Sequence, residues 1–280
     1  MSRISSSNPQ EPERLRQVLR LVGDLTGSDD LSNLRIADLG CFTGAFAIEL
    51  ALHGAEVVGI EGREASIERA RFAARTHNLS RCTFVLDDVR NFSESRYGRF
   101  DFVLCLGILY HLDALSIFGV LDRVGEATDR AAVIDTLISI RGRRVVTHHG
   151  TRFFGERQIE HHQSDSASDR ESKIWSSLNN TESFVLTRPS LYDALHLAGF
   201  TSIFECHWPQ SSIGRSDRIQ LLGLKGGTVD VLTFPEAKPI SSLYEIRRDT
   251  PIWKRAYGFV RSKGAATQAW ISRSWCRSIG

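Results

Sequence analysis

The stretch Asp38-Leu39-Gly40-Cys41-Phe42-Thr43-Gly44 decides the fold of this 280-residue chain. It follows the apolar run 35–39, which predicts a strand, and precedes the Ala- and Leu-rich segment 45–53, which predicts a helix. A strand, a glycine-containing turn and a helix in this order begin a βαβ unit. Gly40 and Gly44 keep side chains out of the turn, so a small ligand can pack against the end of the strand. The carboxylate of Asp38 suits a cationic amino group on such a ligand.

Strands and helices alternate outward from this turn. An amphipathic helix is predicted before it, at 13–25. The strand 100–106 is nearly all apolar, which is typical of a parallel strand buried on both faces. The pattern predicts an α/β fold of the Rossmann-like, doubly wound type, with a mainly parallel seven-stranded sheet. The other predicted strands are 56–60, 82–86, 131–139, 200–207 and 218–225, and the other predicted helices are 64–77, 114–127 and 188–198.

Two further strand ends carry acidic residues. Glu61 follows the second strand, 23 positions after Asp38, close to the spacing of roughly 20 residues at which an acid meets a ribose diol. The turn Asp87-Asp88-Val89 follows the third strand and is placed to accept a hydrogen bond from an adenine amino group. Because the carboxyl ends of parallel strands lie at one edge of a sheet, the three strand ends predict one nucleoside site.

The segments D-L-G-C-F-T-G, G-I-E, L-D-D-V-R and F-D-F-V-L-C-L-G-I-L-Y-H-L together resemble the class I S-adenosylmethionine (SAM)-dependent methyltransferases. The resemblance spans roughly 34–139, with a weaker echo in 183–225, and it implies SAM as the cofactor. A dinucleotide is a poorer fit, because Phe42 and Ala45 stand where G-x-G-x-x-G requires its second and third glycines. The resemblance implies that Asp38, Gly40, Cys41 and Gly44 border the methionine moiety, that Glu61 holds the ribose hydroxyls, that Asp88 and Val89 hold the adenine, and that Leu106 and Gly107 lie near the sulfonium.

The residues that follow strand 100–106 are candidates for catalysis. Methyl transfer from a sulfonium depends mainly on positioning, and it needs a base only when the acceptor is protonated. His111 is a candidate base because histidine titrates near neutral pH, and the alternative is a packing histidine at a helix start. Tyr110 either lines the acceptor pocket or is a core aromatic residue.

The alternation fails between about residues 140 and 183, which we interpret as an insertion beside the active site. Segments 141–150 and 151–159 predict a hairpin, 164–172 is polar, and 179–183 reads as a polar entry into the next helix. The doublets His148-His149 and His161-His162 invite a metal hypothesis. We predict no metal site, because neighbours on a strand point to opposite faces and no nearby carboxylate pattern completes a site.

Composition and charge set the remaining expectations. The chain has no apolar run of about 18 residues and its N-terminus is polar, so we expect a cytoplasmic protein without a membrane span. The five cysteines form no C-x-x-C pair, which argues against a zinc knuckle or a disulfide framework. We place a methyltransferase domain at 1–234 and a basic, aromatic-containing extension at 235–280. The extension has a net charge of +6 against −4 for the rest, and it suits a phosphate-rich or membrane-surface partner, or packing on the domain or on a second copy in a homodimer.

The sequence therefore predicts an enzyme that transfers a methyl group from SAM to a small organic acceptor, more at oxygen than at nitrogen or carbon. Helix 13–25 and the insertion are expected to close over the site. One alternative is an RNA-modifying methyl- or carboxymethyltransferase, because the Tyr-His stretch and S-F-V-L-T-R-P-S-L are similar to the bacterial tRNA wobble-uridine carboxymethyltransferases. Such an enzyme needs a continuous positive surface for nucleic acid. Another alternative is a non-catalytic SAM-binding protein, which would have no cavity reaching the methyl group.

Overall fold

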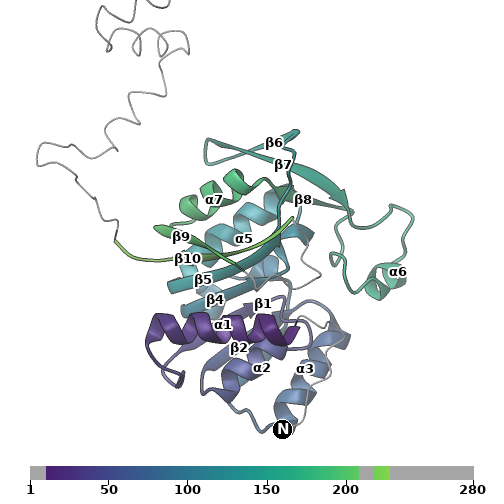
Figure 1. Ribbon diagram of the computed structural model, residues 1–280. Helices are drawn as coiled ribbons and strands as arrows, with labels where there is room; N and C mark the ends of the chain where they lie inside the picture. Colours follow the sequence, from purple (N-terminus) through teal and green to yellow (C-terminus); the bar gives the residue numbers. More distant parts are fainter. Residues whose placement is uncertain (1–10, 208–216, 228–280) are drawn as a thin grey trace, which may run out of the picture. The chain divides into compact units, whose positions relative to one another are not determined.

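A seven-stranded sheet forms the centre of the fold (Figure 1). The computed structural model describes residues 11–207 and 217–227. The strand order is β3-β2-β1-β4-β5-β10-β9. The first five strands run parallel and β10 is antiparallel to both of its neighbours, so the predicted mainly parallel sheet is confirmed. The strands are β1 Arg35–Leu39, β2 Glu56–Glu61, β3 Cys82–Leu86, β4 Phe100–Leu106, β5 Thr128–Leu137, β9 Ser202–Cys206 and β10 Arg218–Leu224.

Helices cover both faces of this sheet (Figure 1). One face carries α1 Glu11–Thr26, α2 Ala45–Leu52 and α3 Glu64–Thr76, and the other carries α5 Ala114–Ala127 and α7 Arg188–Leu197. The predicted doubly wound arrangement is therefore confirmed. The shorter helices are α4 Glu94–Tyr97 and α6 Ala167–Ser172, with single 3₁₀ turns η1 Val89–Asn91 and η2 Leu109–His111.

Local sequence explains where the helices begin and which side they bury. Val18 and Val22, one helical turn apart in α1, are both buried, whereas Arg20 and Asp24 pair on its exposed side. Asp113 caps α5 by accepting hydrogen bonds from the backbone amides at positions 115 and 116, each at 3.0 Å.

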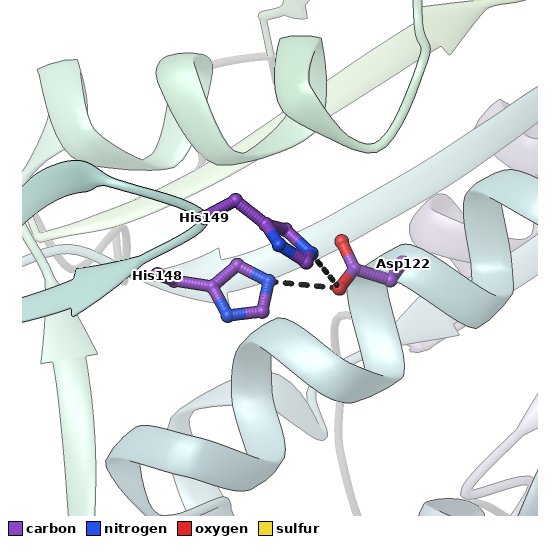
Figure 2. Close-up of side chains that lie close together, drawn as sticks. All are labelled: Asp122, His148 and His149. Atoms are coloured by element: carbon purple, nitrogen blue, oxygen red, sulfur yellow. Dashed lines mark hydrogen bonds and ion pairs between the residues drawn. The ribbon is translucent and has the colours of Figure 1, made fainter.

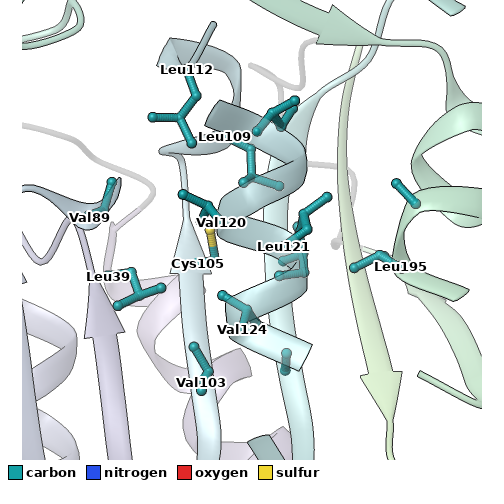
Figure 3. Close-up of a cluster of buried hydrophobic side chains, with 14 of the residues drawn as sticks. Leu39, Val89, Val103, Cys105, Leu109, Leu112, Val120, Leu121, Val124 and Leu195 are labelled. Carbon is teal, nitrogen blue, oxygen red and sulfur yellow. The ribbon is translucent and has the colours of Figure 1, made fainter. Parts of the chain in front are cut away.

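Alternation along the strands divides the core into two layers. Leu39, Val103 and Cys105 face α5 on one side of the sheet, and side chains such as Phe102 face α1 and α2 on the other. Figure 3 shows the first layer, with Leu39, Val103 and Cys105 of the strands close to Val120, Leu121 and Val124 of α5. A one-residue slip of a strand would move every side chain into the opposite layer and disrupt the close packing of both layers, so this packing holds the register of the strands.

The insertion forms a second, antiparallel sheet in the order β6-β7-β8. Its strands are β6 Arg144–His148, β7 Thr151–Ile159 and β8 Glu182–Leu186. The predicted hairpin is confirmed, but the interpretation of 179–183 as an entry into a helix is wrong. β8 pairs with β7, and Phe184 of β8 is buried. Its amide donates a hydrogen bond to Leu112 O at 2.8 Å. Contacts with distant parts of the chain therefore determine the conformation of this segment. The polar segment 164–172 contains α6, which begins with a capping box at Ser166 and Asp169.

The turn between β6 and β7 differs from the expectation for adjacent strand residues. His149 has φ 45° and Gly150 has φ 74°, so the chain leaves the strand conformation at this point. The rings of His148 and His149 lie 4.0 Å apart between centroids, and both approach Asp122 of α5 (Figure 2). The argument that these histidines point to opposite faces and lack a nearby carboxylate is therefore wrong, because it assumed extended backbone through position 149.

Three further expectations concern thiols, membranes and the C-terminal extension. Within the described ranges the cysteines Cys41, Cys82, Cys105 and Cys206 are free thiols. Among residues 11–207 and 217–227, no helix is long and apolar enough to cross a membrane. The basic extension 235–280 lies outside the described residues.

Candidate active site

A cavity of about 1070 Å³ lies at the carboxyl ends of β1, β2 and β4. The order of the strands reverses between β1 and β4, and ligands of doubly wound sheets bind at such a switch point. Helix α1 and the insertion also contribute to the lining, through Arg14 and Trp175 among others. The predicted site residues that line the cavity are Asp38, Gly40, Cys41, Glu61, Val89, Leu106, Gly107, Tyr110 and His111.

The turn after β1 is shaped by left-handed backbone. Gly40 has φ 69°, and a Cβ there would come within 3.2 Å of Ile108, which also lines the cavity. Phe42 has φ 51°, an uncommon conformation for a non-glycine residue. The amides of Gly40 and Cys41 both donate to Ile60 O, which fastens the turn to β2. Because Gly40 lacks a side chain, the turn lines the cavity with backbone at this position.

Two acidic side chains meet at the base of the cavity. Asp38 is buried, and its Oδ2 atom has no hydrogen-bond partner within the described part of the chain. Burial raises the pKa of Asp38 to about 7. Glu61 accepts hydrogen bonds from the amides of Arg63 at 2.8 Å and Phe42 at 3.0 Å, and burial raises its pKa as well. A buried carboxylate with an unused oxygen fits a ligand that carries an ammonium group, and the remaining lone pairs of Glu61 can accept hydroxyl protons.

Two predicted site residues, Gly44 and Asp88, are not among the residues that line the cavity. A Cβ on Gly44 would stand 2.6 Å from Phe84, so this glycine permits close packing of the turn on β3. The carboxylate of Asp88 accepts hydrogen bonds from the side chain and the amide of Arg90. The implied contacts of Gly44 and Asp88 with the cofactor stay predictions.

His111 is oriented by a residue that the sequence did not reveal. Its Nδ1 atom lies 3.0 Å from Glu160 Oε2, and the same oxygen accepts the amide of Ser177 at 2.8 Å. Burial alone would raise the pKa of Glu160, but the hydrogen bond and charge of His111, with the Ser177 amide, hold it below its ordinary value. The arrangement favours the tautomer with the proton on Nδ1, which leaves Nε2 as the acceptor.

Two arginines meet a buried carboxylate near Tyr110. Asp135, at the end of β5, is fully buried and accepts hydrogen bonds from Arg14 at 3.1 Å and Arg218 at 2.6 Å. Both arginines and Tyr110 line the cavity. Burial raises the pKa of Tyr110, and the nearby positive charge of Arg218 opposes this shift. The guanidinium groups of Arg14 and Arg218 supply hydrogen-bond donors to this end of the cavity, and such donors suit oxygen atoms of a ligand.

Arg63 fastens the insertion over the other end of the cavity. Its side chain is buried, and its guanidinium donates to carbonyl oxygens of the segment 170–177. Next to it, Leu178 packs so closely that a Cβ on Gly62 would stand 2.2 Å from Leu178 Cδ1, and Trp175 lies 5.4 Å from Phe42 between ring centroids. The carbonyl acceptors belong to Arg170 at 3.4 Å, Glu171 at 3.2 Å, Lys173 at 3.1 Å, Ser176 at 2.9 Å and Ser177 at 3.1 Å.

Fold and cavity together define the class: a Rossmann-like protein with a nucleoside-type site at the switch point of its sheet. A family model described as a methyltransferase domain matches residues 30–182, which is more than half of the chain. The chain therefore belongs to this methyltransferase family, which uses SAM as its methyl donor.

The chain is similar to two O-methyltransferases. The magnesium-protoporphyrin O-methyltransferase of Rhodobacter capsulatus is 31% identical over 118 residues, which are 42% of this chain and 51% of that protein. The ubiquinone biosynthesis O-methyltransferase of Acinetobacter baumannii (strain AYE) is 28% identical over 101 residues, which are 36% of this chain and 40% of that protein. The chain thus spans about half the length of the curated relatives it matches.

Solved structures show the same architecture. The N-terminal domain of EvdMO1 with SAH bound is 25% identical, has a TM-score of 0.60, and the match covers 79% of this chain and 82% of that one. The magnesium protoporphyrin IX methyltransferase (ChlM) of Synechocystis PCC 6803 with bound SAM is 16% identical, with a TM-score of 0.51 and coverage of 80% and 87%, and it shows likeness of fold alone.

Proposed function

We propose that this protein transfers the methyl group of SAM to an oxygen atom of a small organic acceptor. The observation that carries the proposal is the continuity of the cavity. It runs from Asp38 and Glu61, which suit the amino acid and ribose parts of SAM, to Tyr110, His111 and Arg218. A protein that merely binds SAM would have no need of space beyond Gly107, so the cavity supports an enzyme over a non-catalytic binding protein.

The cofactor end of the cavity fits SAM. SAM supplies an electrophilic methyl group on a sulfonium. The ionised Asp38 would bind its ammonium group, and Glu61 would accept the ribose hydroxyl protons. Phe42 and Trp175 would exclude water from the same end, because their rings lie side by side above the turn. Holding the acceptor oxygen in line with the methyl group is the main catalytic task of such a site.

His111 is the residue that we propose as general base. The neutral imidazole accepts the proton of an acceptor hydroxyl at Nε2, and Glu160 holds the ring and stabilises the imidazolium that results. Arg14 and Arg218 support oxygen as the acceptor atom, because guanidinium groups donate hydrogen bonds to oxygen and repel a protonated amine. Tyr110 contributes a wall of the acceptor space.

Calorimetric titration with SAM, SAH and NAD tests cofactor binding first. We expect binding of SAM and SAH that is lost in Glu61→Ala, and no binding of NAD. A screen of hydroxyl, carboxylate and amine acceptors, read by release of SAH, then tests the reaction. His111→Gln should lower kcat by about 10²–10⁴-fold without changing the affinity for SAM. The matched control His196→Gln, on the exposed side of α7, should leave kcat unchanged.

Three outcomes would contradict the proposal. They are failure to bind SAM, faster methylation of amines than of oxygen acceptors, and a His111→Gln enzyme with unaltered kcat. Glu160→Gln should lower kcat by about 10²-fold, because it leaves the base in place but loosens its position.

The cytoplasmic location and a homodimer through 235–280 belong to the same proposal. Both rest on the sequence: the absence of a long apolar run and the aromatic composition of the extension. Size-exclusion chromatography of the full chain and of a chain ending at residue 234 tests the dimer. A mass that does not depend on the extension would contradict it.

A further inference from the structure

Three side chains with metal-ligating atoms converge outside the cofactor cavity. They are Asp122 of α5, and His148 and His149 at the turn between β6 and β7 (Figure 2). Asp122 Oδ2 lies 2.8 Å from His148 Nε2 and 3.4 Å from His149 Nε2. One ligand atom from each of the three residues can be chosen so that all lie within 4.8 Å of one another, and none of the three lines the cavity.

The backbone and a neighbouring ring hold this arrangement. His149 has φ 45°, in the left-handed region that Asn, Asp and His enter more often than other non-glycine residues, and this brings its ring to the same side as that of His148. The ring of Phe118 stacks on His148 at 4.9 Å between centroids with an interplanar angle of 18°. Phe118 is itself buried, so it limits the directions in which His148 can turn. The backbone conformation of His149 and the packing of Phe118 on His148 thus favour the same arrangement of the three side chains.

We propose that Asp122, His148 and His149 form a binding site for a divalent transition-metal ion, with Zn²⁺ as the representative occupant. Two imidazole nitrogens and one carboxylate oxygen are donors that Zn²⁺ accepts, whereas Mg²⁺ and Ca²⁺ prefer a full set of oxygen ligands. Zinc bonds of about 2.0–2.2 Å in a tetrahedral site separate the ligand atoms by roughly 3.3–3.5 Å. The separation of 3.4 Å between Asp122 and His149 matches this value, the separation of 2.8 Å between Asp122 and His148 must lengthen by roughly half an ångström on binding, and the third pair of ligand atoms lies within 4.8 Å.

The exposure of the cluster determines the kind of site. The side chains of Asp122 and His148 are about a quarter exposed, at 26% and 23%, and His149 is 64% exposed. The remaining coordination position is therefore open to solvent, and water completes the tetrahedron. Binding joins the β6–β7 hairpin to α5, whose first turn follows η2 and His111 directly. The expected consequence is a more stable hairpin, because a ligand that binds only the folded chain shifts the unfolding equilibrium.

Titration of the full chain with Co²⁺ and Zn²⁺ tests the site, after purification without a histidine tag and removal of metals with a chelator. We expect tetrahedral Co²⁺ absorption bands that Zn²⁺ displaces and Mg²⁺ does not. Loss of a residue that only hydrogen-bonds to a metal ligand weakens metal binding by roughly 10–100-fold. Because His148 and Asp122 would bind the metal directly, His148→Gln and Asp122→Asn should each weaken binding by more than this. The control His196→Gln should bind like the parent chain.

Thermal unfolding provides the second measurement. Zn²⁺ should raise the midpoint of the parent chain and of His196→Gln, and should leave the midpoints of the two ligand variants unchanged. Absence of Co²⁺ bands in the parent chain would overturn the proposal. So would equal affinity in the parent chain and both ligand variants, because the metal would then bind elsewhere.

Discussion

Arg63 offers a direct test of how the insertion is held over the cofactor site. We consider Arg63→Met, which keeps the apolar stem of the side chain and removes the guanidinium. A hydrogen bond to a charged group contributes roughly 1.5–3 kcal/mol to stability. Arg63 makes such bonds at 2.9–3.2 Å to the carbonyl oxygens of Glu171, Lys173, Ser176 and Ser177. The guanidinium therefore connects this segment to the start of α3 through four hydrogen bonds.

The expected loss is smaller than the sum of these bonds. Freed carbonyl groups on a surface segment can accept hydrogen bonds from water, so we expect a loss of about 3 kcal/mol, the contribution of one or two charged bonds. The loss should appear as local opening of 170–178 and not as global unfolding, because the sheet and its helices do not depend on this segment. At about 1.4 kcal/mol per factor of ten, the opening constant rises about a hundredfold.

Hydrogen exchange of the amides in 170–178 measures this opening. The affinity for SAM should fall by up to about a hundredfold in parallel, because the apparent dissociation constant is divided by the fraction of chains with the segment in place. Arg71→Met is the matched control, since Arg71 also donates to a backbone carbonyl, that of Phe84, but contacts no part of the insertion in the described ranges. Unchanged exchange and unchanged SAM affinity in a folded Arg63→Met protein would refute the reasoning.

Two further predictions concern Asp38 and Gly44. Burial raises the pKa of Asp38 to about 7; since an ammonium group binds the ionised form, SAM affinity should fall about tenfold from about pH 8 to about pH 6. The same raised pKa means that the unliganded protein loses stability as the pH rises from about 4 to about 7. Calorimetry checks the trend in SAM affinity and urea unfolding checks the trend in stability, and profiles that do not change with pH would contradict both. Gly44→Ala should lower the free energy of unfolding by about 2–3 kcal/mol, because the new Cβ would stand 2.6 Å from Phe84 at φ 82°. Gly226→Ala, where the nearest atom is 3.9 Å away, is the control in urea denaturation, and equal stability of the two variants would count against this packing argument.

Sequence reasoning was most accurate where the signal is local. The strands at 35–39, 82–86 and 100–106 and the helix at 114–127 have the predicted bounds. Runs of apolar residues and turn glycines report the backbone conformation of their own neighbourhood, and parallel strands place their ends together by geometry. For this reason the turn after β1 and the acid at Glu61 could be assigned to one cavity before the structure was known.

The sequence was silent or misleading where distant residues meet. Glu160 lies 49 positions from His111, Arg14 lies 121 positions from Asp135, and nothing in the spacing pairs them. The polar run 179–183 was interpreted as the entry to a helix, whereas Glu182–Leu186 form β8, because pairing with β7 decides the conformation there. The adjacent histidines at the β6–β7 turn were expected to diverge, and a single residue with positive φ brings them together.

The layered α/β fold, the glycine turn and the acidic residues that line the cavity at Asp38 and Glu61 could be predicted from the sequence. These features depend on local signals: the period of the hydrophobic residues, the residues of the turn and the residue type at each strand end. Only the folded chain brings Arg14 and Arg218 to Asp135, at the end of the cavity that we propose for the acceptor, and Arg63 to the carbonyl oxygens of the insertion. Such contacts form between groups that are far apart along the chain. A buried charge is costly without a partner, so these pairs depend on which charged groups the packed layers bring together.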